Sequence, residues 1–164
     1  MENQNDSSVC CPLFKPEKWD KKSFTWTDMK FIKETIPEFF HIPSPNAIDK
    51  KITKMWSSIE KTDAMLENKD DTLILFHDPT PFRGEIFIAV SKEVPNENNV
   101  VLSGNFVSRV YDGGYNDISR FIKDLNSYLA ESQKKAKDFY IHYAYCPKCA
   151  EKYGHNYMII FAEV

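Results

Sequence analysis

The sequence lacks several features that mark large functional classes. No apolar run approaches the ~20 residues that a membrane-spanning helix needs, so we expect no contact with a membrane. The opening stretch MENQNDSSVCC has neither the basic residues nor the apolar segment of a signal peptide, which predicts a cytoplasmic protein. The net charge is −3 and the basic residues are scattered, so binding to nucleic acid is not expected.

Familiar catalytic signatures are missing as well. The glycine pair at 113–114 precedes a helical pattern but has no G-x-G-x-x-G context, so no dinucleotide site is predicted. No serine stands in a nucleophile-elbow context. The histidines lack the short spacing to glutamate that catalytic zinc sites use, and we expect ordinary surface or core residues at His41, His77, His142 and His155. His142 alone is placed on a strand from which it can reach a groove.

The sequence does contain one supersecondary unit that occurs twice. Residues 46–62 and 116–135 each carry four apolar side chains spaced four, three and four residues apart: Ile48, Ile52, Met55 and Ile59, then Ile118, Ile122, Leu125 and Leu129. This spacing places each set on one face of an α-helix, with Asn46 and Asn116 as the expected N-caps. Each helix follows one strand-like run and precedes two more, which predicts a duplicated β-α-β-β unit.

The strand-like runs complete the predicted fold, and they lie at 34–43, 72–76, 85–90, 100–111, 139–145 and 157–164. Because each helix has a single apolar face, we predict an α+β fold with an eight-stranded, mainly antiparallel sheet. Both helices would cover one face of that sheet, and the other face would form a ligand groove. Repeat one would span 33–94 and repeat two 100–164, after an irregular N-terminal strap at 1–32 whose residues 1–9 are disordered.

Alternation along the strands separates a helix-facing side from a groove-facing side. The last strand divides into an aliphatic set and a mixed set: Met158, Ile160, Ala162 and Val164 against Tyr157, Ile159, Phe161 and Glu163. The run at 85–90 places Glu85 and Phe87 on the groove side. Aromatic rings grip planar ligands, and a carboxyl buried among them has a raised pKa that suits general acid or base catalysis. Glu163 is therefore the first catalytic candidate and Glu85 the second, with a solvated chain end and plain core packing as the alternatives.

The four cysteines form a second candidate site. Cys146 and Cys149 stand in a C-x-x-C turn between two predicted strands, as half of a zinc site does, and Cys10 with Cys11 would complete four thiolates. His155 is the alternative fourth ligand, and reduced structural thiols are the alternative to a metal. The zinc would be structural, because four thiolates leave no open position. A thioredoxin-like redox role is not expected, since no helix is predicted to begin at this C-x-x-C.

Two stretches carry a family resemblance. LILFHDPTPFRGEIFIAV joins two strands through an acidic-Pro loop and an Arg, and NFVSRVYDGGYNDISRFIKDLNSYL joins a strand, a Gly-Tyr turn and an amphipathic helix. In these motifs the chain resembles the GyrI-like family of small-molecule-binding proteins over residues 33–164. The beginning from CCPLF and the ending CPKCAEKYGHNYMIIFAEV resemble a stand-alone subgroup described as hydrolases. That resemblance implies hydrolytic opening of the strained ring in cyclopropanoid DNA-alkylating agents, inside an aromatic cage.

Two interpretations of function follow. In the first, the protein detoxifies planar electrophilic xenobiotics by hydrolysis without a cofactor, with Glu163 as acid and base. Its ligand-binding residues would be Trp19, Trp26, Trp56, Glu85, Phe87, Tyr143, Tyr157 and Phe161. In the second, the same groove binds or sequesters aromatic or cationic drugs without chemistry. A zinc-stapled structural protein is a third interpretation. No fused DNA-binding region is recognised, so we expect a free-standing protein whose partner is a small molecule.

Overall fold

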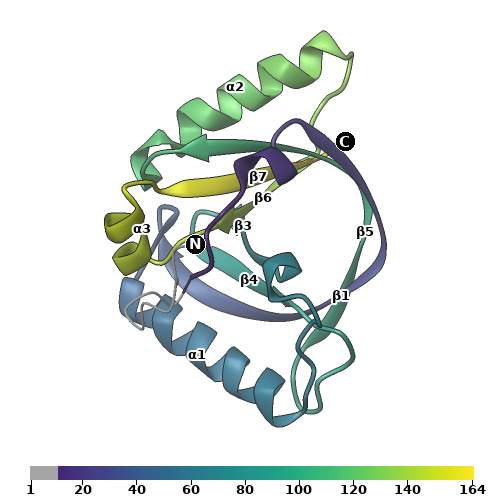
Figure 1. Ribbon diagram of the computed structural model, residues 1–164, viewed down its shortest axis with the longest axis vertical. Coiled ribbons are helices and arrows are strands. Elements are labelled where there is room, and N and C mark those ends of the chain that lie inside the picture. Colours follow the sequence, from purple (N-terminus) through teal and green to yellow (C-terminus); the bar gives the residue numbers. More distant parts are fainter. Residues whose placement is uncertain (1–10) are drawn as a thin grey trace, which may run out of the picture.

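A computed structural model describes residues 11–164 (Figure 1). Over these residues the chain forms seven strands, which build one closed sheet, and three helices. The strands are β1 (Lys22–Phe39), β2 (Ile42–Pro43), β3 (Ile74–Thr80), β4 (Arg83–Ala89), β5 (Asn99–Asp112), β6 (Asp138–Tyr143) and β7 (Tyr157–Glu163). The helices are α1 (Pro45–Lys61), α2 (Ile118–Glu131) and α3 (Pro147–Tyr153). Short 3-10 turns lie at η1 (Pro16–Lys18), η2 (Lys69–Asp71) and η3 (Tyr115–Asp117). Over these residues, no helix has both the length and the hydropathy of a membrane span.

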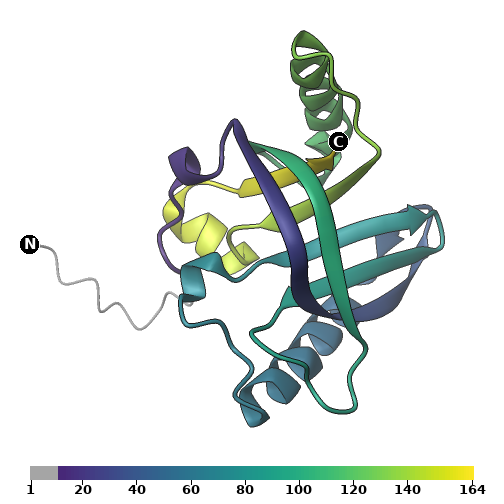
Figure 2. The ribbon, with the colours of Figure 1, turned by 90° about the vertical axis from the view of Figure 1, so that its right-hand side faces the viewer.

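Six of these strands close into a barrel. Their order is β1-β4-β3-β6-β7-β5, and β5 returns to pair with β1, while the short β2 extends the end of β1 as a hairpin. The long strands β1 and β5 run side by side across the molecule, as Figure 2 shows. The predicted eight-stranded sheet is therefore wrong, because β1 and β5 are long enough to curl the sheet until six strands leave no open edge. The α+β class and the antiparallel pairing are confirmed.

The duplicated unit is visible in the topology. The segment β1-α1-β3-β4 forms the strand order β1-β4-β3, and β5-α2-β6-β7 forms the matching order β5-β7-β6. The two units meet at the long β1–β5 ladder and again at a short β3–β6 seam, where Leu75 pairs with His142 and Phe76 with Ile141. The barrel is thus built from two similar halves with one long and one short junction.

Both helices pack on the outside of the barrel, as their apolar stripes predicted. Met55 and Ile59 of α1 are fully buried against the outward side chains of β1 and β4. Leu125 and Leu129 of α2 are buried in the same way against β5 and β7. The four-three-four spacing therefore identified two core-facing helix surfaces correctly.

The predicted helix N-caps are wrong, by two residues for α1 and by one residue for α2. α1 begins at Pro45 with Ser44 at the N-cap, not at Asn46, because proline lacks an N–H and suits the first helical position. α2 begins after the 3-10 turn η3 with Asp117 at its N-cap, one residue beyond Asn116.

The inward sides of the strands fill the barrel with aromatic rings. Trp26 packs with its ring centroid 4.1 Å from that of Phe106 and 5.3 Å from that of Phe161, and both phenylalanines are buried. The alternation predicted for β7 is confirmed: Met158, Ile160 and Ala162 belong to the α2 layer, whereas Ile159 and Phe161 belong to the interior. The face that was expected to hold an open groove is instead enclosed by the closed sheet and densely packed.

The N-terminal segment is more regular than predicted. The strap that was expected to stay irregular through residue 32 becomes a strand at Lys22, and β1 continues to Phe39 with a bulge between Trp26 and Met29. The aromatic residues of this segment, which alternate in sequence with polar and charged residues, pack into the barrel interior. The predicted disorder of residues 1–9 falls outside the described residues.

The connection between β6 and β7 also differs from its prediction as a plain turn. It forms α3, with Cys146 at the N-cap, Pro147 in the first turn, and Gly154 at the C-cap with a φ of 72°. Proline at a helix start and a left-handed glycine at its end are ordinary helix boundaries. The expectation that no helix begins at the C-x-x-C is therefore wrong.

Two substitutions on α1 test this packing. Ile59→Ala removes a side chain with no exposed surface and should lower the free energy of unfolding by about 2–5 kcal/mol. Ile52→Ala lies on the same helix face, where the side chain is only partly buried, and should cost clearly less. Urea unfolding followed by circular dichroism measures both. An equal loss of unfolding free energy in the two variants would contradict the packing described for this helix.

Candidate functional site

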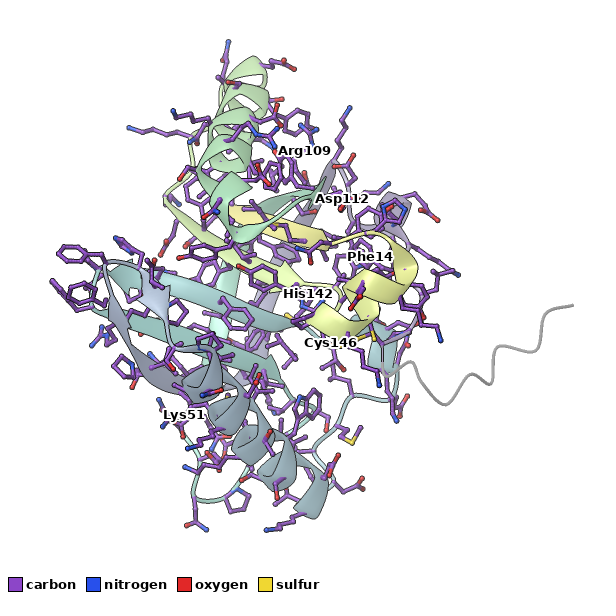
Figure 3. The ribbon with its side chains drawn as sticks, turned by 90° about the vertical axis from the view of Figure 1, so that its left-hand side faces the viewer. Phe14, Lys51, Arg109, Asp112, His142 and Cys146 are labelled. Carbon is purple, nitrogen blue, oxygen red and sulfur yellow. The ribbon has the colours of Figure 1, made fainter. Side chains whose placement is uncertain are left out.

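A cleft of about 1740 Å³ lies on the helix side of the barrel, along the β3–β6 seam where the two repeats meet. Figure 3 looks onto this side, with α2 above, α1 below and α3 between them. A site at the seam between the repeats was predicted, but on the opposite face of the sheet. The difference arises because closure fills the inner face, and the seam can then open only between the two helices.

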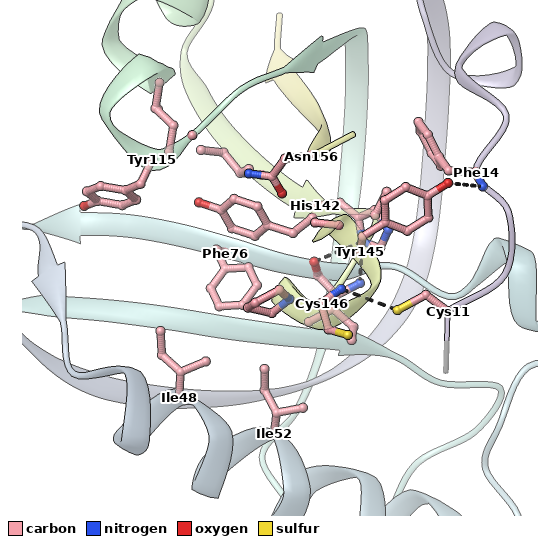
Figure 4. A pocket seen from close by; sticks show the side chains of 18 of the residues that line it. Cys11, Phe14, Ile48, Ile52, Phe76, Tyr115, His142, Tyr145, Cys146 and Asn156 are labelled. Atoms are coloured by element: carbon pink, nitrogen blue, oxygen red, sulfur yellow. Dashed lines mark hydrogen bonds between the residues drawn. The ribbon is translucent and has the colours of Figure 1, made fainter. Parts of the chain in front are cut away.

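The cleft has apolar walls and an aromatic floor. α1 contributes Ile48, Ile52 and Trp56, α2 contributes Ile118 and Ile122, and the outward side chains Ile74, Phe76, Ile141 and Tyr143 come from β3 and β6. The rings of Phe76 and Tyr143 meet edge to face with centroids 5.2 Å apart. In Figure 4, Phe76 lies above Ile48 and Ile52, with Tyr115 toward one end and Cys11 toward the other. Such a surface suits a flat apolar guest.

The two helix stripes explain why the cleft exists. In each helix the C-terminal half of the stripe is buried against the barrel, at Met55 and Ile59 in α1 for example. The N-terminal half, which includes Ile48 and Ile52 in α1, is only partly buried and lines the cleft. The apolar stripe of each helix looks uniform in sequence, yet its C-terminal half packs against the barrel and its N-terminal half lines the cleft.

One end of the cleft carries a polar cluster of Glu38, His41 and Asp78, all three of which line it. His41 Nδ1 pairs with the Asp78 carboxylate, and one oxygen or nitrogen from each of the three residues lies within 4.8 Å of the others. The Tyr115 hydroxyl donates a hydrogen bond to the His41 carbonyl oxygen. No sequence pattern singled out Glu38 or Asp78, and His41 was expected to be an ordinary histidine. Only the acidic-Pro stretch, whose Asp78 lies near the end of β3, indicated this place.

The turn that presents His41 is conformationally strained. Phe40 and His41 have φ values of 49° and 64° in a two-residue loop between the paired residues Phe39 and Ile42. Such loops favour Asn and Gly, because larger side chains resist positive φ. The His41 N–H donates to the Pro81 carbonyl oxygen at 2.9 Å, and the contacts named above also hold this residue. Backbone strain that is maintained by surrounding contacts is often found at functional sites.

Glu38 lies beside Asp78 in a partly buried position. Gly84 leaves space for it, since a Cβ atom at residue 84 would collide with the Glu38 carboxyl group. Glu38 Oε2 is buried and has no hydrogen-bond partner within residues 11–164. Burial, reinforced by the Asp78 carboxyl, raises the pKa of Glu38 to about 8. At neutral pH Glu38 therefore mostly holds a proton that it can donate to a ligand in the cleft.

Two tyrosine hydroxyls complete the polar surface. Burial raises the pKa of Tyr143 to about 12, and burial together with the carboxylates of Asp78 and Glu38 also raises the pKa of Tyr115. Both hydroxyls stay protonated across the physiological range. The Tyr115 hydroxyl already donates its proton to the His41 carbonyl oxygen, so it can only accept a hydrogen bond from a bound molecule, whereas the Tyr143 hydroxyl can donate one.

The structure brings some of the predicted ligand-binding residues to the cleft and leaves others elsewhere. Those that line it are Trp19, Trp56, Glu85 and Tyr143. Trp26, Phe87 and Phe161 instead belong to the barrel interior. Tyr157 stacks on His155 with ring centroids 4.8 Å apart. The aromatic content noted in the sequence is therefore divided between core packing and the cleft.

The two carboxylates proposed from the sequence have different surroundings. Glu163 ends β7 outside the cleft, and its Oε1 lies 3.5 Å from the place of a Cβ on Gly104. Glu85 accepts hydrogen bonds from His77 Nδ1 at 2.8 Å and Lys33 Nζ at 3.2 Å. Burial acts to raise the pKa of Glu85, but these hydrogen bonds outweigh it and lower the pKa. Glu85 is thus held ionised and is poorly suited to donate a proton.

The remaining histidines occupy defined environments. His77 bridges Glu85 and Asp138, with its Nε2 2.7 Å from Asp138 Oδ2. His142 borders the cleft, although the groove predicted for it was on the other face of the sheet. Burial lowers the pKa of His142 to about 4, so the ring is neutral. His155 Nδ1 lies 2.7 Å from the Asp112 carboxylate. All three also line the cleft, so His41 is set apart by its place beside the two carboxyl groups of Glu38 and Asp78.

Three cysteines meet toward the other end of the cleft. The sulfurs of Cys11, Cys146 and Cys149 lie within 4.8 Å of one another, an arrangement that could hold a metal ion. The Cys146 N–H donates to Cys11 Sγ at 3.4 Å. The predicted ligand Cys10 lies outside the described residues, and the alternative ligand His155 is not part of this group. The predicted convergence of the N-terminus with the C-x-x-C is therefore correct for three of the four thiols.

Comparisons with known proteins bear on this site. The family model described as Bacterial hydrolase matches residues 1–164. No curated protein matches the chain. The EcmrR C-terminal domain is similar in structure, with a TM-score of 0.65, 12% identity, and coverage of 88% of this chain and 96% of that one. At this identity the likeness shows the fold alone.

Two further solved structures show weaker similarity. A putative bacterial transcription regulation protein from Staphylococcus aureus MU50 has a TM-score of 0.47, 16% identity, and coverage of 89% of this chain and 98% of that one. The structure of SAV2435 bound to tetraphenylphosphonium has a TM-score of 0.48, 13% identity, and coverage of 88% and 93%. With TM-scores below 0.5, neither supports an argument about this chain.

The raised pKa of Glu38 predicts a dependence of stability on pH. Between the ordinary value of 4.5 and about 8, the folded state holds a proton on Glu38 that the unfolded state releases. The free energy of unfolding should therefore fall as pH rises through this window. Glu38→Gln, which cannot ionise, should lose less stability than the wild type between pH 6 and pH 9 in urea unfolding. Identical losses in the two proteins would contradict the protonation state described here.

Proposed function

Since the chain belongs to the Bacterial hydrolase family, in agreement with the resemblance noted in its sequence, we propose that it binds planar aromatic small molecules and hydrolyses electrophilic ones in the cleft between α1 and α2. The observation that carries this proposal is the partly buried Glu38 carboxyl, with its raised pKa, beside the His41–Asp78 pair at the end of an apolar cleft. The resemblance to stand-alone hydrolases favours cyclopropanoid DNA-alkylating agents as substrates, and hence a role in detoxifying xenobiotics.

The shape of the cleft supports a flat guest. A planar ring system would rest against Phe76 and Tyr143, with the side chains of Ile48, Ile52 and Trp56 on the α1 side. These groups supply apolar area and give little directional bonding. Orientation would come from the Tyr143 hydroxyl and from Glu38, which would both donate hydrogen bonds to a carbonyl oxygen.

The proposed chemistry adds one water molecule across a strained carbon–carbon bond. Glu38 donates its proton to the carbonyl oxygen that is conjugated with the ring, and the water oxygen bonds to a ring carbon. The ring bond breaks, and its electron pair passes through the conjugated system to the protonated carbonyl. His41 Nε2 accepts the proton that the water loses, and the two side chains then return to their starting states by exchange with solvent.

Asp78 acts through His41 in this scheme. Its carboxylate accepts the hydrogen bond from Nδ1, which leaves the lone pair on Nε2 and stabilises the ring when it becomes charged. Each proton transfer is assigned to a side chain, so the scheme requires no cofactor. Glu163, the acid proposed from the sequence, does not line the cleft, and this favours Glu38 for the role.

A pair of isosteric variants separates the two carboxylates. Glu38→Gln should lower kcat for a cyclopropanoid substrate by about 10²–10⁴-fold with little change in binding, because only proton donation is lost. Glu163→Gln should keep kcat near the wild-type value. Turnover is followed by mass spectrometry of the water adduct, and binding by quenching of tryptophan fluorescence. The opposite pattern would assign the acid to Glu163.

The pH dependence gives a second test. The value of kcat/KM should fall as pH rises above about 8, because Glu38 then loses the proton that it donates. Steady-state kinetics between pH 6 and pH 10 measure this decline. A constant kcat/KM through pH 9 would exclude Glu38 as the acid. Tight binding without any water adduct would favour the second interpretation, a protein that sequesters its ligand.

A further inference from the structure

We propose that Cys11, Cys146 and Cys149 bind one zinc ion, and that this ion clamps residues 11–15 against α3 to form the end wall of the cleft. The metal assignment is independent of the hydrolase proposal, whereas its effect on the cleft rests on that proposal.

The geometry of the three sulfurs supports a tetrahedral metal site. Thiolates bound to one zinc ion at about 2.3 Å each lie within about 4 Å of one another. The three sulfurs already lie within 4.8 Å of one another, although Cys11 and Cys146 are 135 residues apart in sequence. Only small side-chain movements would therefore bring Cys11, Cys146 and Cys149 to zinc-ligand distances.

The polypeptide holds the sulfurs of distant segments together. The Cys146 N–H donates to Cys11 Sγ at 3.4 Å, which ties the N-terminal segment to the start of α3. Cys146 caps α3 and Cys149 is buried within it, so the C-x-x-C is presented by a turn leading into a helix. Three cysteine ligands favour zinc over hard cations such as Mg²⁺ or Ca²⁺, which take oxygen ligands.

The site that the structure describes consists of these three sulfurs. The fourth ligand predicted from the sequence, Cys10, directly precedes Cys11 and lies outside the described residues. His155, the other candidate, pairs with Asp112 and stacks on Tyr157, away from the sulfur cluster.

The segment that the ion would hold is part of the cleft wall. Cys11 through Lys15 line the cleft, and they rest on the α3 region through a small set of polar and ring contacts. The Phe14 N–H donates to the Tyr145 hydroxyl at 2.9 Å, and the Tyr153 hydroxyl donates to the Cys11 carbonyl oxygen at 3.1 Å. Phe14 packs against the rings of Tyr145 and Tyr157, but Leu13 is 55% exposed, so the apolar anchoring of this stretch rests on one side chain. A metal cross-link would supply a second anchor.

Metal content tests the site directly. The full chain, expressed with zinc and purified under reducing conditions, should contain about one zinc per chain by mass spectrometry of the elements. Cys11→Ser should lower that content at least about fivefold while circular dichroism shows a folded protein. Cobalt substitution of the wild type should give sulfur-to-metal charge-transfer bands.

Two control variants identify the ligands. His155→Ala should retain the zinc, and Glu38→Gln should retain it as well, because the cluster at the other end of the cleft is not the metal site. A wild-type protein without zinc would overturn the proposal, as would full retention in Cys11→Ser.

Limited proteolysis measures whether zinc holds this segment in place, and it requires neither substrate nor activity. Trypsin can cut after Lys18, an exposed residue just beyond the clamped stretch. Removing zinc with a chelator should speed this cleavage at least about tenfold, because the segment then opens more often. The fragment beginning at Trp19 is detected by mass spectrometry. Equal cleavage rates with and without zinc would show that the ion does not hold the segment.

Discussion

The pairing of β1 with β5 is the interaction on which the rest of the structure depends. It extends from Lys22 opposite Ser108 to Ile32 opposite Asn99 and joins the first strands of the two repeats. Because this ladder closes the ring, the inner face of every strand must be filled by side chains, and aromatic rings such as Phe106 and Phe161 do so. The helices then have to pack outside, and the seam opposite the ladder becomes the place where a cleft can open between them.

Closure also decides which polar groups meet. The end of β1 lies next to β4, and β4 pairs with β3, so Glu38 comes close to Asp78 although 40 positions separate them in the sequence. The backbone at Gly84 leaves room for the Glu38 carboxyl, and burial next to a second carboxyl keeps that group protonated. A proton donor, a histidine and an apolar cavity thus come together at one end of the cleft, while the thiols gather toward the other.

Much of the fold could be predicted because its signals are local. The helix stripes have a period that only an α-helix satisfies, and the alternation in β7 separates the α2-facing side from the interior correctly. The cysteine grouping was predictable because so few residue types bind soft metals. The site at Glu38, His41 and Asp78 was not, since no spacing rule links a strand end, a hairpin turn and a distant strand. α3 was missed because its helix signals were interpreted as a metal-binding turn.

The sequence by itself determined the duplicated β-α-β-β unit, the side of β4 and of β7 that faces the helices, and the meeting of Cys11 with the C-x-x-C. These follow from periodicity and residue chemistry within short stretches. Only the tertiary structure decided that the sheet closes, and therefore that Trp26 and Phe161 are core rather than cage. It also decided that the cleft lies on the helix side with Glu38 at its end. Closure depends on the length and twist of strands whose paired residues lie 67 to 86 positions apart in the sequence, which no local pattern reports.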